Sequence, residues 1–206
     1  MSDPARDPIV TPLPDDHHGA SVTLAEVSLA LAWNVRGDPA QASFVAAAER
    51  ILGLPLPLQR ATSSRRSDTA LLWLGPRSWL LVAATGSAWN GFDATRNVLN
   101  AAGGALFDVS ASYVAWSVSG EAASRVLNRS CPLDLHPRAF PAGKCAQSVL
   151  GHVGALLYRP IEQPAFVVLA ARSFAADAWT ALCAAAACER LRIGPAALFG
   201  AASPQK

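Results

Sequence analysis

Apolar residues recur along this chain with two different spacings, one typical of strands and one typical of helices. Short runs rich in Val, Leu, Ala and Trp have the composition of half-buried or fully buried strands. Longer segments carry apolar residues three and four positions apart, which places them on one face of a helix. Strands are predicted at 22–35, 70–74, 79–84, 105–109, 113–119, 148–159 and 165–170, and helices at 38–52, 87–102, 120–129 and 173–190.

Turn and cap residues mark where several of these elements begin and end. Asp38 and Pro39 suit the start of a helix, because Asp caps the first turn and Pro fits the first helical position. Gly53 suits its end. Ser173 has the chemistry of an N-cap for the last helix. The segment 75–78, Gly-Pro-Arg-Ser, favours a tight turn between two strands.

The order of these elements repeats. A helix lies between pairs of strands twice along the chain, which predicts an α+β fold of two similar lobes, each an antiparallel sheet with packed helices. The predicted division is a flexible N-terminal arm at 1–20, a first lobe at 21–104, a second lobe at 105–193 and a loose tail at 194–206.

The segment 131–147 predicts a long shaped loop in the second lobe. Its prolines and glycines exclude a regular helix or a central strand, because Pro lacks a backbone donor and fixes φ. Leu133, Leu135 and Phe140 give it apolar anchors. Long ordered loops are often functional, so this one is a candidate for an interaction surface.

Four residues of this loop are candidate interface residues: Asp134, His136, Arg138 and Phe140. The first three alternate with the apolar anchors, which favours an outward direction toward a partner. The alternative is that they satisfy backbone groups within the loop.

Composition limits the possible partners. Half of the 206 residues are apolar and only 16% are charged, which fits a subunit whose surface is partly covered, or an Ala-rich composition that dilutes the charges. The net charge of +2 and the lack of a basic patch with interleaved aromatics argue against nucleic-acid binding. The start of the sequence has no apolar signal region, and no run is long enough for a membrane span, so a cytoplasmic location with reduced thiols is expected.

No catalytic, cofactor-binding or metal-binding residue is predicted in this chain. Cys131, His136, Cys145 and His152 could in principle hold zinc, but their spacing is wider than that of typical structural zinc ligands. The alternative is that the thiols are buried and the imidazoles bond loop backbone. The glycines do not form the G-x-G-x-x-G pattern of a dinucleotide site.

Three segments carry a resemblance to a known family. They are FDVSASYVAWSVSGEAASRVLNR, CPLDLHPRAFPAGKCAQSVLGHV and FVVLAARSFAADAWTAL, and the similarity runs from about 70 to 182. They resemble the gamma subunit of heterotetrameric sarcosine oxidase. The first 20 or so residues show no such match.

The resemblance implies a folate-binding aminomethyltransferase-like fold and a mainly structural subunit. The family's complex demethylates sarcosine to glycine and passes the one-carbon unit to tetrahydrofolate. The implied partners are the alpha, beta and delta subunits, principally alpha. FAD, FMN, NAD, zinc and tetrahydrofolate are expected on those other subunits.

Other functions stay open at this point. One is the equivalent subunit of a related N-methyl amino acid oxidase or dehydrogenase. Another is a stand-alone folate-binding protein of the same fold, in one-carbon transfer or iron–sulfur assembly. The segment 143–147, Gly-Lys-Cys-Ala-Gln, is similar to the Lys-Gly-Cys-Tyr-x-Gly-Gln-Glu signature of iron–sulfur assembly proteins. However, Gly and Lys are swapped, and the Tyr and the final Gly-Gln-Glu are missing. A third is an independent oxidoreductase, which bound flavin would reveal.

Overall fold

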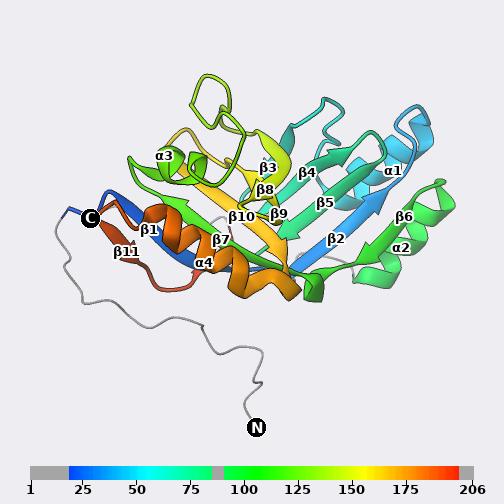
Figure 1. Ribbon diagram of the computed structural model, residues 1–206. Helices are drawn as coiled ribbons and strands as arrows, with labels where there is room; N and C mark the ends of the chain where they lie inside the picture. The colour runs from blue at the N-terminus through cyan, green and yellow to red at the C-terminus, as the bar shows by residue number, and fades with distance from the viewer. Residues whose placement is uncertain (1–18, 85–90, 200–206) are drawn as a thin grey trace, which may run out of the picture.

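The computed structural model describes residues 19–84 and 91–199, which form two sheets with packed helices (Figure 1). The strands are β1 (Val22–Ser28), β2 (Leu31–Arg36), β3 (Ser63–Arg66), β4 (Thr69–Gly75), β5 (Ser78–Ala83), β6 (Ala105–Asp108), β7 (Tyr113–Ser119), β8 (Cys145–Leu150), β9 (Val153–Tyr158), β10 (Ala165–Ala171), β11 (Leu191–Ile193) and β12 (Ala197–Leu198). The helices are α1 (Ala42–Leu52), α2 (Phe92–Ala101), α3 (Ala123–Asn128) and α4 (Ala175–Ala186), with short 3-10 turns η2 (Ser110–Ser112) and η3 (Arg172–Phe174).

The two sheets are mainly antiparallel. The five-stranded sheet has the order β3-β4-β5-β2-β6, and the seven-stranded sheet has the order β11-β1-β7-β10-β9-β8, with β12 also paired to β1. Only β11 and β12 run parallel to a neighbour among the pairs in the described residues. This arrangement confirms the predicted α+β class.

Sheet membership does not follow the expected division of the chain after residue 104. β1 pairs with β7 of the seven-stranded sheet, whereas β6 pairs with β2 of the five-stranded sheet. The segment 22–35, predicted as one strand, therefore breaks between Ser28 and Leu31 and enters a different sheet on each side of the break. Each half of the chain contributes one strand to the other half's sheet, which binds the halves together.

The core has three layers, set by alternation along the strands. On β10, Phe166 and Val168 pack toward α3 and α4, while Val167 and Leu169 pack between the two sheets. On β4, Leu71 packs toward α1 and α2. The strands with apolar residues on both faces are thus covered on both faces, by helices outside and by the other sheet inside.

The start of the first helix differs from the prediction. α1 begins at Ala42, because Asp38 forms a turn ahead of it and its carboxylate pairs with Arg77 at 2.6 Å. Gly53, with φ of 65°, ends α1 as predicted.

The last helix also starts later than predicted. Ser173 does not cap it, because Ser173 lies inside η3 and α4 begins after it. The helix predicted at 87–102 appears as α2, and residues 85–90 lie outside the described part.

Two further segments are more regular than predicted. The single strand expected at 148–159 is a hairpin of β8 and β9, which turns at Gly151 with φ of 62°. The tail expected to be loose from Gly194 pairs with β1 through β12, and Phe199 is buried. The expected flexible arm falls, up to residue 18, outside the described residues.

Glu189 joins the helices outside the seven-stranded sheet. Its carboxylate accepts from the Arg125 guanidinium at 2.9 Å and from Arg129 at 2.8 Å. The Ser21 hydroxyl also donates to it at 3.3 Å. The hydrogen bonds from Arg125, and next the one from Arg129, hold the pKa of Glu189 down at about 2.

Replacing Glu189 should make the stability of the chain depend less on pH in the acid range. The folded carboxyl has a lower pKa than its unfolded value of about 4.3, so its contribution is present above that pH and is lost as pH falls toward 2. We expect the urea midpoint of Glu189→Gln to lie below that of the parent chain at pH 7 and to approach it at pH 3. The control is Glu26→Gln, at an exposed strand position. A gap between parent and Glu189→Gln that stays constant with pH would contradict this role.

Candidate functional site

The long loop follows the turn at 129–130 that ends α3, and β8 starts at Cys145, so the loop spans 131–144 rather than 131–147. Its apolar anchors pack as predicted. Leu135 is fully buried and Phe140 is 5% exposed, while the Phe140 ring lies 6.2 Å from the ring of Phe166 on β10. The loop is thereby packed onto the face of the seven-stranded sheet that α3 and α4 also cover.

A buried arginine that the sequence analysis did not identify holds the second half of this loop. Arg159, just after β9, is 2% exposed. Its guanidinium donates to the carbonyl of Phe140 at 2.8 Å and to that of Glu162 at 2.6 Å, and it lies 5.9 Å from the centre of the Phe166 ring. Its backbone also bonds Gly143 and Lys144. No sequence signal marks this role, since the strand pattern alone does not show that the residue is covered.

The four candidate interface residues are used in different ways. The Asp134 carboxylate accepts from the backbone N–H of His136 at 2.9 Å, and His136 Nδ1 accepts from the backbone N–H of Arg138 at 3.3 Å. These bonds match the internal alternative, although both side chains are exposed. Arg138 is exposed, and no described side chain pairs with it. Phe140 belongs to the chain's own core, so its ring does not face a partner.

The cysteine and histidine set is dispersed within the described residues. Cys131 and Cys145 are buried, whereas His136 and His152 are exposed. No group of three or more potential metal-binding side chains occurs in this part of the chain. Burial raises the pKa of the Cys145 thiol to about 11, so it stays protonated at neutral pH and is a poor nucleophile.

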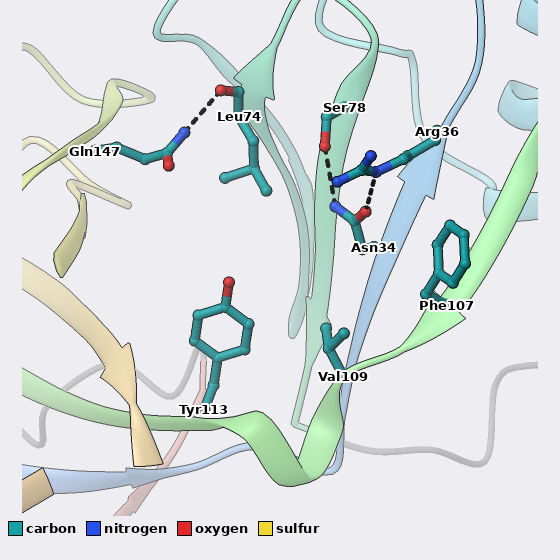
Figure 2. A pocket seen from close by; sticks show the side chains of 8 residues that line it. All are labelled: Asn34, Arg36, Leu74, Ser78, Phe107, Val109, Tyr113 and Gln147. Carbon is teal, nitrogen blue, oxygen red and sulfur yellow. Dashed lines mark hydrogen bonds between the residues drawn. The ribbon is translucent and has the colours of Figure 1, made fainter. Parts of the chain in front are cut away.

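A groove of about 650 Å³ lies where the two sheets meet (Figure 2). The five-stranded sheet and the segment after it contribute most of its lining, and the seven-stranded sheet contributes Tyr113 and Gln147. Figure 2 shows the Tyr113 hydroxyl pointing into the space between these walls. Its lining residues are Asn34, Arg36, Leu74, Ser78, Phe107, Val109, Tyr113 and Gln147.

The sequence analysis did not single out this groove. Its residues come from strands that are far apart in the sequence, and these strands belong to different sheets, as β2 and β8 do. Burial raises the pKa of Tyr113, which keeps its phenol protonated and able to donate a hydrogen bond. The polar side chains of the lining are a guanidinium, two amides and two hydroxyls, which are groups that recognise a ligand through hydrogen bonds and charge.

None of the described helices combines the length and the apolar composition that a membrane span requires.

Comparison with known proteins gives consistent matches along most of the chain. A family model described as sarcosine oxidase, gamma subunit family, matches residues 36–188. The sarcosine oxidase subunit gamma of Arthrobacter sp is 37% identical over 149 residues, which cover 72% of each chain. That of Corynebacterium sp. (strain P-1) is 35% identical over 152 residues, again 72% of each.

Solved structures agree with these matches. A chain of the heterotetrameric sarcosine oxidase from Corynebacterium sp. U-96, in complex with pyrrole 2-carboxylate, has a TM-score of 0.70 and 29% identity, covering 91% of this chain and 90% of that one. The glycine cleavage system aminomethyltransferase T from Bartonella henselae has a TM-score of 0.58 and 16% identity over 84% of this chain and 48% of that one, which shows a shared fold. The family model and the relatives above 30% identity together establish that this chain belongs to the sarcosine oxidase gamma subunit family.

Proposed function

We propose that this chain is the gamma subunit of a heterotetrameric sarcosine oxidase, which oxidatively demethylates sarcosine to glycine. One observation carries the proposal: the match to a chain of such a complex covers nine-tenths of both chains, at 91% and 90%. The likeness is therefore to a whole subunit and not to one shared domain.

The proposed role of the chain is structural. The dispersal of its thiols and imidazoles and the high pKa of Cys145 support a subunit that leaves the chemistry to others. FAD, FMN, NAD, zinc and tetrahydrofolate would then be held by the alpha, beta and delta subunits. The alpha subunit is the principal partner in this proposal, and the location would be cytoplasmic.

Co-expression with the three other subunits of its host tests the proposal. We expect the chain to purify with them as one complex that consumes oxygen when sarcosine is added, and the chain alone to show no such activity. Purification of the other three subunits as an active complex without this chain would contradict the proposal, as would a flavin spectrum from the chain alone.

The exposed side of the long loop is part of the proposed contact with the alpha subunit. Arg138 lies on a loop that Arg159 and the apolar anchors already hold in place, so the loop loses little conformational entropy on binding. Truncating a buried interface Arg commonly costs about 2 kcal/mol or more. We expect Arg138→Ala to weaken capture by the alpha subunit by about tenfold or more and to leave the melting temperature unchanged.

The matched control for this variant is Arg60→Ala, at another exposed loop arginine. Equal capture of both variants would show that Arg138 is not part of the contact with the alpha subunit. A large melting loss in Arg138→Ala with unchanged capture would assign Arg138 to the fold instead.

A further inference from the structure

The groove between the sheets contains a guanidinium that is held in place but not neutralised. Arg36 Nε donates to the side-chain oxygen of Asn34 at 2.8 Å. The Asn34 amide in turn donates to the Ser78 hydroxyl at 3.0 Å (Figure 2). It also donates to the Trp79 carbonyl at 3.2 Å. No carboxylate of the described residues forms an ion pair with Arg36. The relay orients the guanidinium and leaves its two terminal nitrogens available to a carboxylate from outside.

The other end of the groove is also suited to an acidic ligand. Arg172 donates to the backbone carbonyls of Ala111 and Tyr113 at 2.9 and 3.0 Å, so a second guanidinium holds the backbone that carries Tyr113. The nearby carboxylate of Asp108 is bonded to the backbone and hydroxyl of Ser110 at 2.9 and 2.6 Å. The groove therefore presents the positive charge of Arg36 and, across from it, the Tyr113 hydroxyl as a hydrogen-bond donor.

An apolar surface and an open sheet edge adjoin this charged groove. Phe107 is 51% exposed, and its ring centre lies 6.0 Å from the Arg36 guanidinium carbon. Phe107 belongs to β6, the last strand of its sheet, and no strand of the described part pairs with the side of β6 that faces away from β2. An unpaired edge offers backbone groups to an added strand. Arg and aromatic side chains are also the residues that carry most energy in protein interfaces.

We propose that the groove and the open edge of β6 form a docking surface for an extended acidic segment of another subunit of the sarcosine oxidase complex. A carboxylate of that segment binds Arg36, an apolar side chain covers Phe107, and the backbone runs along β6. The occupant is an acidic partner segment because Arg36 has no carboxylate partner among the described residues, and because a free strand edge beside an exposed ring suits an extended chain. This inference rests on the proposed function.

Photo-cross-linking within the assembled complex tests the contact directly. The variant Phe107→p-benzoylphenylalanine places the probe at the groove, and Leu58→p-benzoylphenylalanine places it at another exposed apolar position, in the loop after α1. We expect position 107 to cross-link to a partner peptide that contains Asp or Glu, and position 58 not to reach that peptide. A cross-link from 107 to residues 1–18 of the same chain, to a second copy of it, or to no chain at all would overturn the proposal.

Binding measurements give an independent test. We expect Arg36→Gln to weaken capture by the partner subunits by about tenfold or more, because an interfacial Arg that pairs with a carboxylate is a typical binding hot spot. The control Arg192→Gln, at an exposed arginine on β11, should bind as the parent chain does, and both variants should keep the parent's melting temperature. Equal capture of Arg36→Gln and the parent would overturn the docking surface.

The parent chain separates this failure from a failure of the proposed function. A parent chain that does not assemble with the sarcosine oxidase subunits would overturn the proposed function and the partner named here. Assembly of the parent with no effect of Arg36→Gln and no cross-link at 107 would overturn the docking surface and leave the proposed function standing.

Discussion

Replacing Phe199 with Ala should destabilise the chain by about 3–5 kcal/mol, the usual loss for a buried Phe. Phe199 is 2% exposed and packs in the layer between the two sheets, with its ring stacked on that of Tyr158 at 6.2 Å. Its backbone N–H also bonds the carbonyl of Ser28 at the end of β1. A fall in melting temperature on the order of 10 °C is expected for a domain of this size.

The neighbouring residue provides the control. Leu198 is 55% exposed, so Leu198→Ala should change stability by no more than about 0.5 kcal/mol. Thermal unfolding of both variants, followed by circular dichroism, compares one buried and one exposed side chain in the same short strand region. Similar melting temperatures for the two variants would mean that the Phe199 ring does not stabilise the core between the sheets.

Local features of the sequence predicted much of the fold. The segment 75–78 does join β4 to β5, and Gly53 does end α1, because turn and cap chemistry acts over a few residues. The exchange of β1 and β6 between the sheets could not be predicted in this way. Strand pairing depends on residues that are distant in the sequence, such as the pairing of Trp33 with Asp108. Local alternation does not specify which partner a strand chooses.

The functional residues were predicted less completely, for a similar reason. The loop and its anchors Leu135 and Phe140 were found because prolines and apolar residues cluster in one segment. The groove was missed because Arg36 and Tyr113 lie on different strands of different sheets. The family resemblance, which runs from about 70 to 182, identified the family correctly, but it did not identify the residues that form either surface.

Arg159 stabilises both the long loop and the core beneath it through one buried side chain. Its guanidinium donates to the carbonyls of Phe140 and Glu162 and lies over the ring of Phe166. No described carboxylate forms an ion pair with it, so these carbonyls and the aromatic ring are what stabilise its buried charge. Removing the guanidinium leaves carbonyl groups without their donors, which costs about 1–3 kcal/mol for each one that stays buried.

We therefore expect Arg159→Met to lower the free energy of unfolding by about 2–4 kcal/mol, although Met retains most of the apolar volume. The loop should also loosen before the chain unfolds, because it loses the bond at Phe140. Urea unfolding measures the first effect. Hydrogen exchange of residues 131–144 at low urea measures the second, and faster exchange is expected there than in the parent chain.

Arg172→Met is the matched control, because it separates burial from the number of hydrogen bonds. Arg172 also donates to two backbone carbonyls, those of Ala111 and Tyr113, but it is exposed. Water can replace its guanidinium at those carbonyls, so the loss should stay below about 1 kcal/mol. Equal losses for Arg159→Met and Arg172→Met would show that burial of the Arg159 bonds adds nothing. Unchanged exchange in residues 131–144 would show that the apolar anchors alone hold the loop in place.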